Sequence, residues 1–219
     1  MLAYIVIAVV AYLLGSIPTG YLAGRARGID IRAVGSGNMG ATNVFRTLGT
    51  TAGVIVLVVD ALKGYAACTL LVAVLFARRY SDFPDRLINF DELEHAKILA
   101  GIFAVLGHNF TCWLKFKGGK GIATSAGVFF ALAPLAVSVA LGAWIIVFAL
   151  SRYVSVASIA AAVALPATVW LTPNSLTLRI VTTALGLLAI AKHKSNIERL
   201  FSGTERRFGQ KTATPEATK

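Results

Sequence analysis

Residues 2–24, LAYIVIAVVAYLLGSIPTGYLAG, form an apolar run without a single charged side chain. Residues 121–151 are a second uncharged run, and residues 51–77 carry only Asp60 and Lys63. A helix needs about 20 consecutive apolar residues to cross the hydrocarbon layer of a bilayer. These three runs therefore predict helices that span a membrane.

The composition of the whole chain agrees with a membrane protein. Of its 219 residues 57% are hydrophobic and only 14% are charged, whereas about a quarter of the residues of a soluble domain are charged. A cleaved signal peptide is the alternative for residues 2–24, but this run is long, lacks a basic start and is interrupted by Gly15, Pro18 and Gly20. We expect one membrane domain over residues 1–208 and a disordered tail over residues 209–219.

The distribution of charge along the chain predicts its topology. Further apolar segments lie near residues 95–114, 154–171 and 175–191. The loops at 25–50 and 115–121 and the C-terminal tail are basic, whereas residues 78–94 hold half of the chain's ten acids. The positive-inside rule places the basic loops in the cytoplasm and the acidic loop outside.

All basic clusters share one side only if residues 121–151 cross the membrane twice, with a bend near Pro134, because proline interrupts a helix. The sequence therefore predicts an all-α, polytopic integral membrane protein with about seven transmembrane helices. One or two of these are expected to be short or half-inserted. The N-terminus is expected outside and the C-terminus inside.

The excess of positive charge predicts an anionic partner. The formal net charge is +11, which suits a lipid headgroup or a soluble phosphate. Nucleic acid is not expected, because the basic residues lie between membrane segments. Cys68 and Cys112 lie in apolar runs without metal-ligand spacing, so we interpret them as small hydrophobic residues. The acids cluster in the loop predicted to lie outside, so no metal site is expected, and we expect no cofactor.

The first of three polar segments is GSGNMGATN at residues 35–43, followed by Arg46. Glycines allow backbone N–H groups to converge on an anion, while Ser, Thr and Asn side chains add neutral donors. Arg46 offers a planar clamp for phosphate oxygens. Against the alternative of a plain flexible loop, we expect anion binding here by Gly35, Ser36, Gly37, Asn38, Gly40, Thr42, Asn43 and Arg46.

The same glycines match the dinucleotide-binding pattern GxGxxG, with Asp60 at the distance of a ribose-binding acid. The context is wrong for that fold. Residues 29–32, IDIR, are too polar for a buried strand, and the apolar run continues beyond Asp60 as a membrane helix does. We therefore set the dinucleotide interpretation aside.

The second polar segment is FKGGKG at residues 116–121, which leads into an apolar run. It is not a Walker A loop, because Lys120 is followed by glycine instead of Ser or Thr. A glycine-rich turn at the start of a helix nevertheless favours an anion, and Lys120 adds a full charge. A basic anchor for the flanking helices explains the lysines but not Gly118, Gly119 and Gly121.

The third polar segment is HKSNIERL at residues 193–200, followed by Gly203 and Glu205. On a helix, His193 and Asn196 share one face, and a histidine near neutrality can orient or deprotonate a hydroxyl. A basic tail that binds anionic lipid is the alternative. Weaker signals are the intramembrane pair Asp60 and Lys63 and the segment with Arg152, Ser155 and Ser158.

Together these segments resemble the bacterial membrane acyl-phosphate:glycerol-3-phosphate acyltransferases, the PlsY family. The resemblance covers residues 1–206 and rests on GSGNMGATNVFR at 35–46, FKGGKGIATSAG at 116–127, RYVSVAS at 152–158 and HKSNIERLFSGTE at 193–205. One departure is Thr111, where the family usually has a proline three residues after the histidine that corresponds to His108. This departure puts a role for His108 in doubt.

The resemblance implies an enzyme that transfers a fatty acyl group from acyl phosphate to the sn-1 hydroxyl of glycerol 3-phosphate. The products are lysophosphatidic acid and phosphate, in the first step of phospholipid synthesis. It also implies a multi-pass protein of the bacterial cytoplasmic membrane, with its active site at the cytoplasmic face, which we expect to act as a monomer in the lipid bilayer. We expect catalytic roles for Ser36, Arg46, Lys120, His193 and Asn196. Substrate contacts are expected from Gly35, Gly37, Asn38, Gly40, Thr42, Asn43, Gly118, Gly119, Gly121, Arg152, Ser155, Ser158, Gly203 and Glu205.

The expected mechanism is direct attack within a ternary complex. Acyl phosphate is an activated anhydride, so alignment of the hydroxyl with the carbonyl is sufficient. Ser36 and His193 would position the hydroxyl, and the base is either His193 or a substrate phosphate oxygen. A transporter is the rival class, supported by Asp60, Lys63 and the break at Pro134, but the chain shows no internal repeat. A structural lipid-binding protein is a third alternative.

Overall fold

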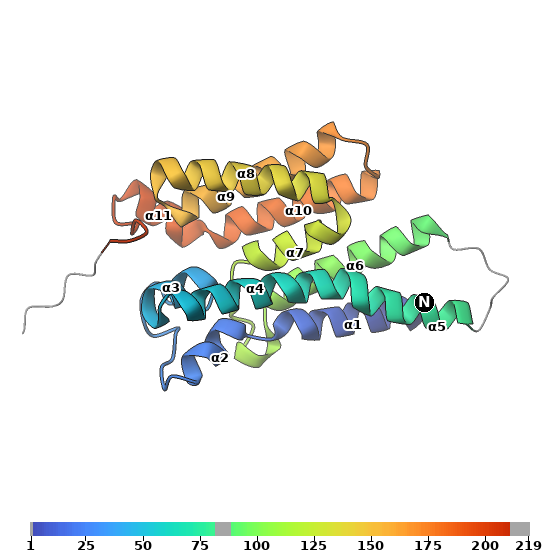
Figure 1. Cartoon of the computed structure of the whole chain (residues 1–219), viewed down its shortest axis with the longest axis horizontal. Helices are drawn as coiled ribbons and strands as arrows, with labels where there is room; N and C mark the ends of the chain where they lie inside the picture. Colours follow the sequence, from blue (N-terminus) through green and yellow to red (C-terminus); the bar gives the residue numbers. More distant parts are fainter. Residues whose placement is uncertain (1, 82–88, 211–219) are drawn as a thin grey trace, which may run out of the picture.

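The computed structural model describes residues 2–81 and 89–210, without the side chains of residues 77–81, and these residues form helices joined by loops (Figure 1). Of the predicted acidic loop, residues 82–88 lie outside the described residues, whereas residues 78–81 end α5 and residues 90–94 begin α6. The predicted disordered tail lies outside the described residues except for residues 209 and 210. The helices are α1 (Leu2–Ser16), α2 (Thr19–Arg25), α3 (Ala41–Leu48), α4 (Thr50–Ala66), the π-helix η1 (Ala67–Leu71), α5 (Val72–Ser81), α6 (Phe90–Asn109), the 3₁₀-helix η2 (Cys112–Leu114), α7 (Ile122–Leu132), α8 (Pro134–Ser151), α9 (Val154–Leu171), α10 (Leu176–Lys192) and α11 (Lys194–Phe201).

Five helical stretches in the described chain are long and apolar enough to cross a membrane. They are Leu2–Arg25, Thr50–Phe76, Phe90–Leu114, Pro134–Ser151 and Val154–Leu171. A sixth results if α10 and α11, which are bent by 52° at His193, form one span. The prediction of an all-helical membrane fold is confirmed, while the total of about seven crossings stays a prediction.

The predicted break at Pro134 is present. Helix α7 ends at Leu132 and α8 begins at Pro134, whose fixed φ and missing N–H suit the first turn of a helix. With 11 residues, α7 is about 16 Å long, against the roughly 30 Å of the hydrocarbon layer. One half of the broken segment is therefore short, as the sequence predicted.

Small residues allow this short helix to lie very close to α4. A Cβ added at Gly127 would lie 1.8 Å from the carbonyl oxygen of Ala61, and one at Gly64 would lie 2.2 Å from that of Thr124. Such contacts bring two backbones together without intervening side chains, a common feature of helix packing in membranes. They fix the first half of α7 against the C-terminal part of α4.

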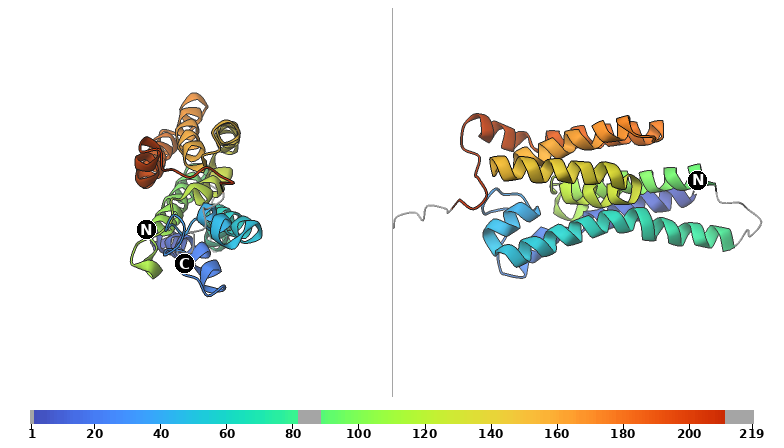
Figure 2. Two further views of the ribbon diagram at one scale, coloured as in Figure 1. Left: turned by 90° about the vertical axis from the view of Figure 1, so that its left-hand side faces the viewer. Right: turned by 45° about the horizontal axis from the view of Figure 1, so that its top comes forward.

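The two ends of the described chain lie at opposite ends of the helical bundle (Figures 1 and 2). The N-terminus of α1 is at one end, whereas α2, α3, α11 and the segment after α11 gather at the other (Figure 1). This arrangement agrees with termini on opposite sides of a membrane. Large apolar side chains such as Leu13, Val58, Ile146 and Leu187 are exposed on the outer faces of the helices, where they suit a lipid environment.

Candidate active site

A cavity of about 260 Å³ lies among the ends of the helices near α3 and α11. It receives side chains from α3, α4, α6, α7, α8, α9 and α11, as well as from the loops before α3 and after α11. Most residues of the predicted site meet here. They are Ser36, Asn38, Gly40, Thr42, Asn43, Arg46, Lys120, Gly121, Ser155, Ser158, His193, Asn196 and Glu205.

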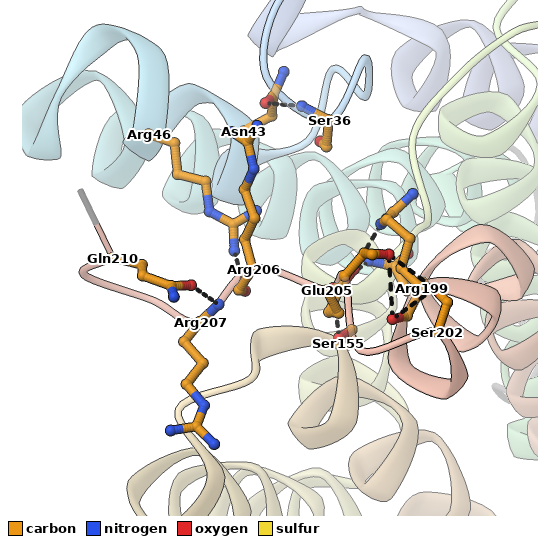
Figure 3. Close-up of polar contacts among 12 residues, drawn as sticks. Ser36, Asn43, Arg46, Ser155, Arg199, Ser202, Glu205, Arg206, Arg207 and Gln210 are labelled. Carbon is orange, nitrogen blue, oxygen red and sulfur yellow. Dashed lines mark hydrogen bonds and ion pairs between the residues drawn. The ribbon is translucent and has the colours of Figure 1, made fainter. Parts of the chain in front are cut away.

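Asn43 holds the first polar segment in shape. Its Oδ1 accepts a hydrogen bond from the Ser36 amide at 2.8 Å, as Figure 3 shows. Its Nδ2 donates to the carbonyls of Ile31 at 2.9 Å and Val34 at 3.0 Å. The side chain is 2% exposed and its polar atoms have partners within the protein, so Asn43 positions Ser36. A substrate contact by Asn43, which also lines the cavity, stays a prediction.

Gly118 and Gly119 also serve packing. Their amides donate to the carbonyls of Asn109 at 3.2 Å and His108 at 3.0 Å, so both N–H groups have acceptors within the protein. A Cβ on Gly119 would lie 2.1 Å from Nε2 of His108. The two glycines therefore let the loop before α7 fold directly onto the end of α6.

Two helix N-termini border the cavity in place of these amides. Helix α3 follows Gly40 and α7 follows Gly121, and neither first turn carries a side-chain cap. Within the described chain, the amides of Ala41 and Ile122 have no hydrogen-bond acceptor, and both residues line the cavity. Free N–H groups and the helix dipole together attract anions.

A hydrogen-bonded chain joins the second and third polar segments. Nζ of Lys120 donates to Oδ1 of Asn196, whose Nδ2 donates to Oε1 of Glu205 at 2.7 Å. Glu205 also accepts from Ser155 at 2.8 Å and from Nε of Arg199 at 2.7 Å (Figure 3). Glu205 thus fixes Asn196, which in turn orients the ammonium group of Lys120.

Burial and neighbouring groups shift the pKa values of Lys120 and Glu205, the two ionisable ends of this hydrogen-bonded series. Burial lowers the pKa of Lys120 from 10.5 to about 8; Glu205 opposes this shift, and the cations Arg199 and Arg46 reinforce it. Burial alone would raise the pKa of Glu205, but hydrogen bonds from Asn196, Arg199 and Ser155 outweigh burial, and the net pKa is lowered. Lys120 therefore loses its proton more readily than an exposed lysine does, and Glu205 keeps its negative charge to lower pH than an exposed glutamate does.

His193 sits at the bend between α10 and α11 and is 4% exposed. Its Nδ1 lies 2.8 Å from the carbonyl oxygen of Ala189. Because a carbonyl oxygen only accepts, Nδ1 carries the proton, and Nε2 of the neutral ring is left as an acceptor. That nitrogen is suited to receive a hydrogen bond from a hydroxyl group.

Some predicted residues lie outside the cavity lining. Arg152 ends α8 in the left-handed region (φ 62°), and its carbonyl accepts from the Phe208 amide at 2.8 Å. Gly203 is exposed beyond α11. Gly37 and Gly118 line a separate hollow beside Asp30 and Arg32. Substrate contacts by Arg152, Gly203, Gly35, Gly37, Gly118 and Gly119 stay predictions.

Sequence reasoning missed Trp144 and set His108 aside. Both line the cavity, and Nε1 of Trp144 donates to Oγ of Ser158 at 3.2 Å. Trp144 lies within an uncharged run where nothing distinguished it from lipid-facing residues. His108 was discounted only because Thr111 replaces a proline, yet its ring is buried at the cavity wall.

An apolar hollow of about 100 Å³ adjoins the polar cavity. The two share Ile122, Ala126, Leu141 and Trp144, and the apolar hollow continues among side chains that include Phe129, Leu165 and Leu185. A ligand with one polar and one hydrocarbon end would fit this combination. Among the described residues, no group of three His, Cys, Asp or Glu side chains is placed to hold a metal ion.

The fold and the site define an integral membrane enzyme that handles an anionic substrate. The family model described as glycerol-3-phosphate acyltransferase matches residues 5–203, and the chain belongs to this family. It is 46% identical to a glycerol-3-phosphate acyltransferase of Geobacter sulfurreducens over 95% of this chain and 99% of that protein. It is 41% identical to one of Chlorobaculum parvum over 97% and 100% of the two chains.

Two crystal structures of PlsY (YgiH), an integral membrane glycerol 3-phosphate acyltransferase, are similar to most of this chain. The glycerol 3-phosphate form superposes with a TM-score of 0.80 at 36% identity, covering 94% of this chain and 96% of that one. The lysophosphatidic acid form gives a TM-score of 0.78 at 35% identity over 94% and 95%. The resemblance to the PlsY family noted from the sequence is confirmed.

Proposed function

We propose that this enzyme transfers a fatty acyl group from acyl phosphate to the sn-1 hydroxyl of glycerol 3-phosphate, releasing lysophosphatidic acid and phosphate. The observation that carries this proposal is the pairing of two helix N-termini with two cations around one cavity. Helix α3 contributes its N-terminus and Arg46, and the turn before α7 contributes its N-terminus and Lys120. Two phosphate groups need two such sites, because their mutual repulsion must be offset before reaction.

The adjoining apolar hollow accounts for the acyl chain. A donor whose phosphate lies near Lys120 can extend its hydrocarbon tail past Ile122 and Ala126 toward Phe129. Burial of apolar surface there stabilises the complex by about 25 cal/mol per Å². Glycerol 3-phosphate has no such tail and would occupy the polar part near Ser36 and Arg46.

The reaction needs alignment more than activation. The sn-1 oxygen attacks the acyl carbon, a new ester C–O bond forms, and the bond from the acyl carbon to the phosphate oxygen breaks. Nε2 of His193 accepts a hydrogen bond from the sn-1 hydroxyl group, while Ser36 helps to orient that group. The proton passes either to His193 or to the departing phosphate. Arg46, Lys120 and Asn196 hold the phosphate oxygens through the step.

Purified protein in detergent, supplied with glycerol 3-phosphate and palmitoyl phosphate, tests the proposal. We expect equal amounts of lysophosphatidic acid and inorganic phosphate, with the acyl group on the sn-1 oxygen as determined by mass spectrometry. Palmitoyl-coenzyme A in place of palmitoyl phosphate should give no product. Transfer only from coenzyme A would refute the proposed donor, and no acyl transfer with either donor would favour the rival transporter or lipid-binding functions.

We further propose that the enzyme works as a monomer in the bacterial inner membrane, with the cavity open to the cytoplasm. The basic residues at the α3 and α11 end of the bundle support this orientation. Both substrates are water-exposed phosphates at the reacting end, whereas the product keeps its acyl chain in the bilayer.

A further inference from the structure

A buried trio of charged and polar side chains lies at the wall of the cavity, formed by Asp60, Lys63 and His108, and Asp60 and His108 line the cavity. The three residues are 2%, 4% and 4% exposed. Nζ of Lys63 lies 2.8 Å from Oδ1 of Asp60, 3.0 Å from Nδ1 of His108 and 3.0 Å from the carbonyl oxygen of Ile17. Oδ1 of Asp60 also accepts a hydrogen bond from Thr19 at 3.0 Å.

The geometry around Lys63 fixes the tautomer of His108. An ammonium group has three protons and no lone pair, and Lys63 has three acceptors around it. The adjacent carboxylate of Asp60 keeps Lys63 charged, because an unpaired buried carboxylate is costly. Lys63 therefore donates to Nδ1 of His108, so that the ring proton must lie on Nε2.

This N–H is left free at the cavity. Nε2 of His108 has no hydrogen-bond partner in the described chain, and the atom is not fully buried. Because His108 lines the cavity, this nitrogen is accessible from the cavity. The absence of a side chain at Gly119 keeps the nitrogen uncovered, since a Cβ there would lie 2.1 Å away. A free N–H group next to a proposed phosphate site can donate a hydrogen bond to a phosphate oxygen.

We propose that His108, held as the Nε2–H tautomer by Lys63, donates a hydrogen bond to a phosphate oxygen of a bound substrate. Acyl phosphate and glycerol 3-phosphate share this acceptor chemistry. The proposal rests on the acyltransferase function and adds His108 to the residues that touch substrate, with Lys63 and Asp60 as positioning residues. His193, whose Nδ1 faces a carbonyl, acts as an acceptor, so the two histidines have opposite roles.

The tautomers can be measured without any assay of activity. In protein labelled with ¹⁵N-histidine, His193 and His95 should both be Nδ1–H tautomers, because their Nδ1 atoms face the carbonyls of Ala189 at 2.8 Å and Asp91 at 2.6 Å. His108 should give the single Nε2–H pattern, and this pattern should vanish in His108→Gln. Adding inorganic phosphate should shift the His108 Nε2 signal. An Nδ1–H pattern for His108, or an Nε2 signal that phosphate leaves unmoved, overturns the proposal.

The role of Lys63 has its own spectroscopic signature. Asp60→Asn combined with Lys63→Met removes both buried charges together and leaves no uncompensated ion. We expect His108 in this double variant to populate both tautomers. Retention of the pure Nε2–H pattern would show that Lys63 does not control the ring.

Kinetics of two His108 variants test the contact with substrate. The amide nitrogen of His108→Gln can reach the position of Nε2, whereas that of His108→Asn reaches only the position of Nδ1. With palmitoyl phosphate and glycerol 3-phosphate, we expect kcat/KM to fall about 10- to 100-fold in His108→Asn and clearly less in His108→Gln. The control His95→Gln, at an exposed residue outside the cavity, should be unchanged.

The Michaelis constants of the same variants identify the ligand. A larger rise in KM for palmitoyl phosphate places the contact on the donor, and a larger rise for glycerol 3-phosphate places it on the acceptor. Equal losses in His108→Asn and His108→Gln overturn the donor role. If wild-type protein transfers no acyl group while phosphate still shifts the His108 signal, the proposed reaction fails but the phosphate contact stands.

Discussion

At the scale of single residues, the candidate site depends on cations. The pKa of one of them, Lys120, is lowered to about 8, so its charge is lost in mildly alkaline solution. Burial is the main cause of the lowered pKa of Lys120, the negative charge of Glu205 opposes the shift, and the positive charge of Arg46 adds to it. Asn196 receives the ammonium hydrogen bond and is itself fixed by Glu205. The lysine is thus oriented before a substrate arrives, and under the proposed function this lowers the cost of organising the site around a phosphate oxygen during reaction.

Replacement of this lysine should remove activity. Lys120→Ala deletes the charge and leaves Asn196 without its donor, so we expect kcat/KM for acyl transfer to fall at least about 100-fold, as for the loss of an electrostatic stabiliser. Lys117→Ala is the matched control, because Lys117 is an exposed lysine of the same loop outside the cavity. Near-normal turnover by Lys120→Ala, with thermal stability preserved, would contradict the assignment.

The pH dependence of the reaction should report the same group. The pKa of Lys120 is lowered to about 8, so its charge is present below this pH and is lost as the pH rises through it. We expect kcat/KM, which follows the free enzyme, to decline above about pH 8. In Lys120→Arg the guanidinium stays charged, so the alkaline decline should move to higher pH even if the overall rate is lower. An unchanged midpoint would assign the decline to another group.

At the scale of elements, glycines decide how closely the helices approach. Gly127 on α7 touches the backbone of α4 at Ala61, and this contact sets the position of the α7 N-terminus at the cavity. The segment after α11 also joins distant elements. Phe208 packs edge-on against Phe45 of α3, with ring centroids 6.2 Å apart, and against Phe148 of α8 at 5.6 Å.

A pair of glycine substitutions tests this close approach. Gly127→Ala places a methyl group 1.8 Å from the Ala61 oxygen, so the helices must separate, and we expect a loss of about 1–3 kcal/mol of stability. Gly142→Ala on α8 is the control, because its added Cβ has no heavy atom within 4 Å apart from its chain neighbours and the adjacent backbone of its own helix. Thermal unfolding in detergent should show a lower midpoint for Gly127→Ala alone. Equal midpoints would mean that α7 is not held by backbone contact.

At the scale of the whole molecule, polar groups gather at one end of an apolar bundle. Lys117 lies in the loop before α7, whereas Pro173 lies in the turn between α9 and α10 at the end that carries the N-terminus (Figure 1). The proposed orientation places the first in the cytoplasm and the second outside. Both residues are exposed, so both positions can be probed from water.

Labelling of single cysteines should distinguish the two faces. In whole cells of a Cys112→Ser background, an impermeant maleimide should modify Pro173→Cys directly. Lys117→Cys should react only after the membrane is opened. The reverse pattern would invert the topology, and it would place the cavity on the side that lacks cytoplasmic substrates.

Much of the fold could be predicted from the sequence, because hydrophobic length and charge act locally. Helix α9 spans Val154–Leu171, as its apolar run indicated, and the break before Pro134 follows from the chemistry of proline. The separation of α1 from α2 at Ile17 and Pro18 was not foreseen as a break between two helices. The π-helix η1 was not foreseen either, since it has no signature in an apolar run.

The sequence by itself determined that the chain is a helical membrane protein, and it predicted three polar segments that bind phosphate. These properties follow from residue chemistry and short-range spacing, which folding does not alter. Only the tertiary structure decided which groups remain free at the cavity. It directed the Asn43 side chain and the Gly118 and Gly119 amides to internal partners, because each buried polar group must find a partner nearby. It also brought Lys63 to His108 across 45 residues of sequence, a contact that no local pattern encodes.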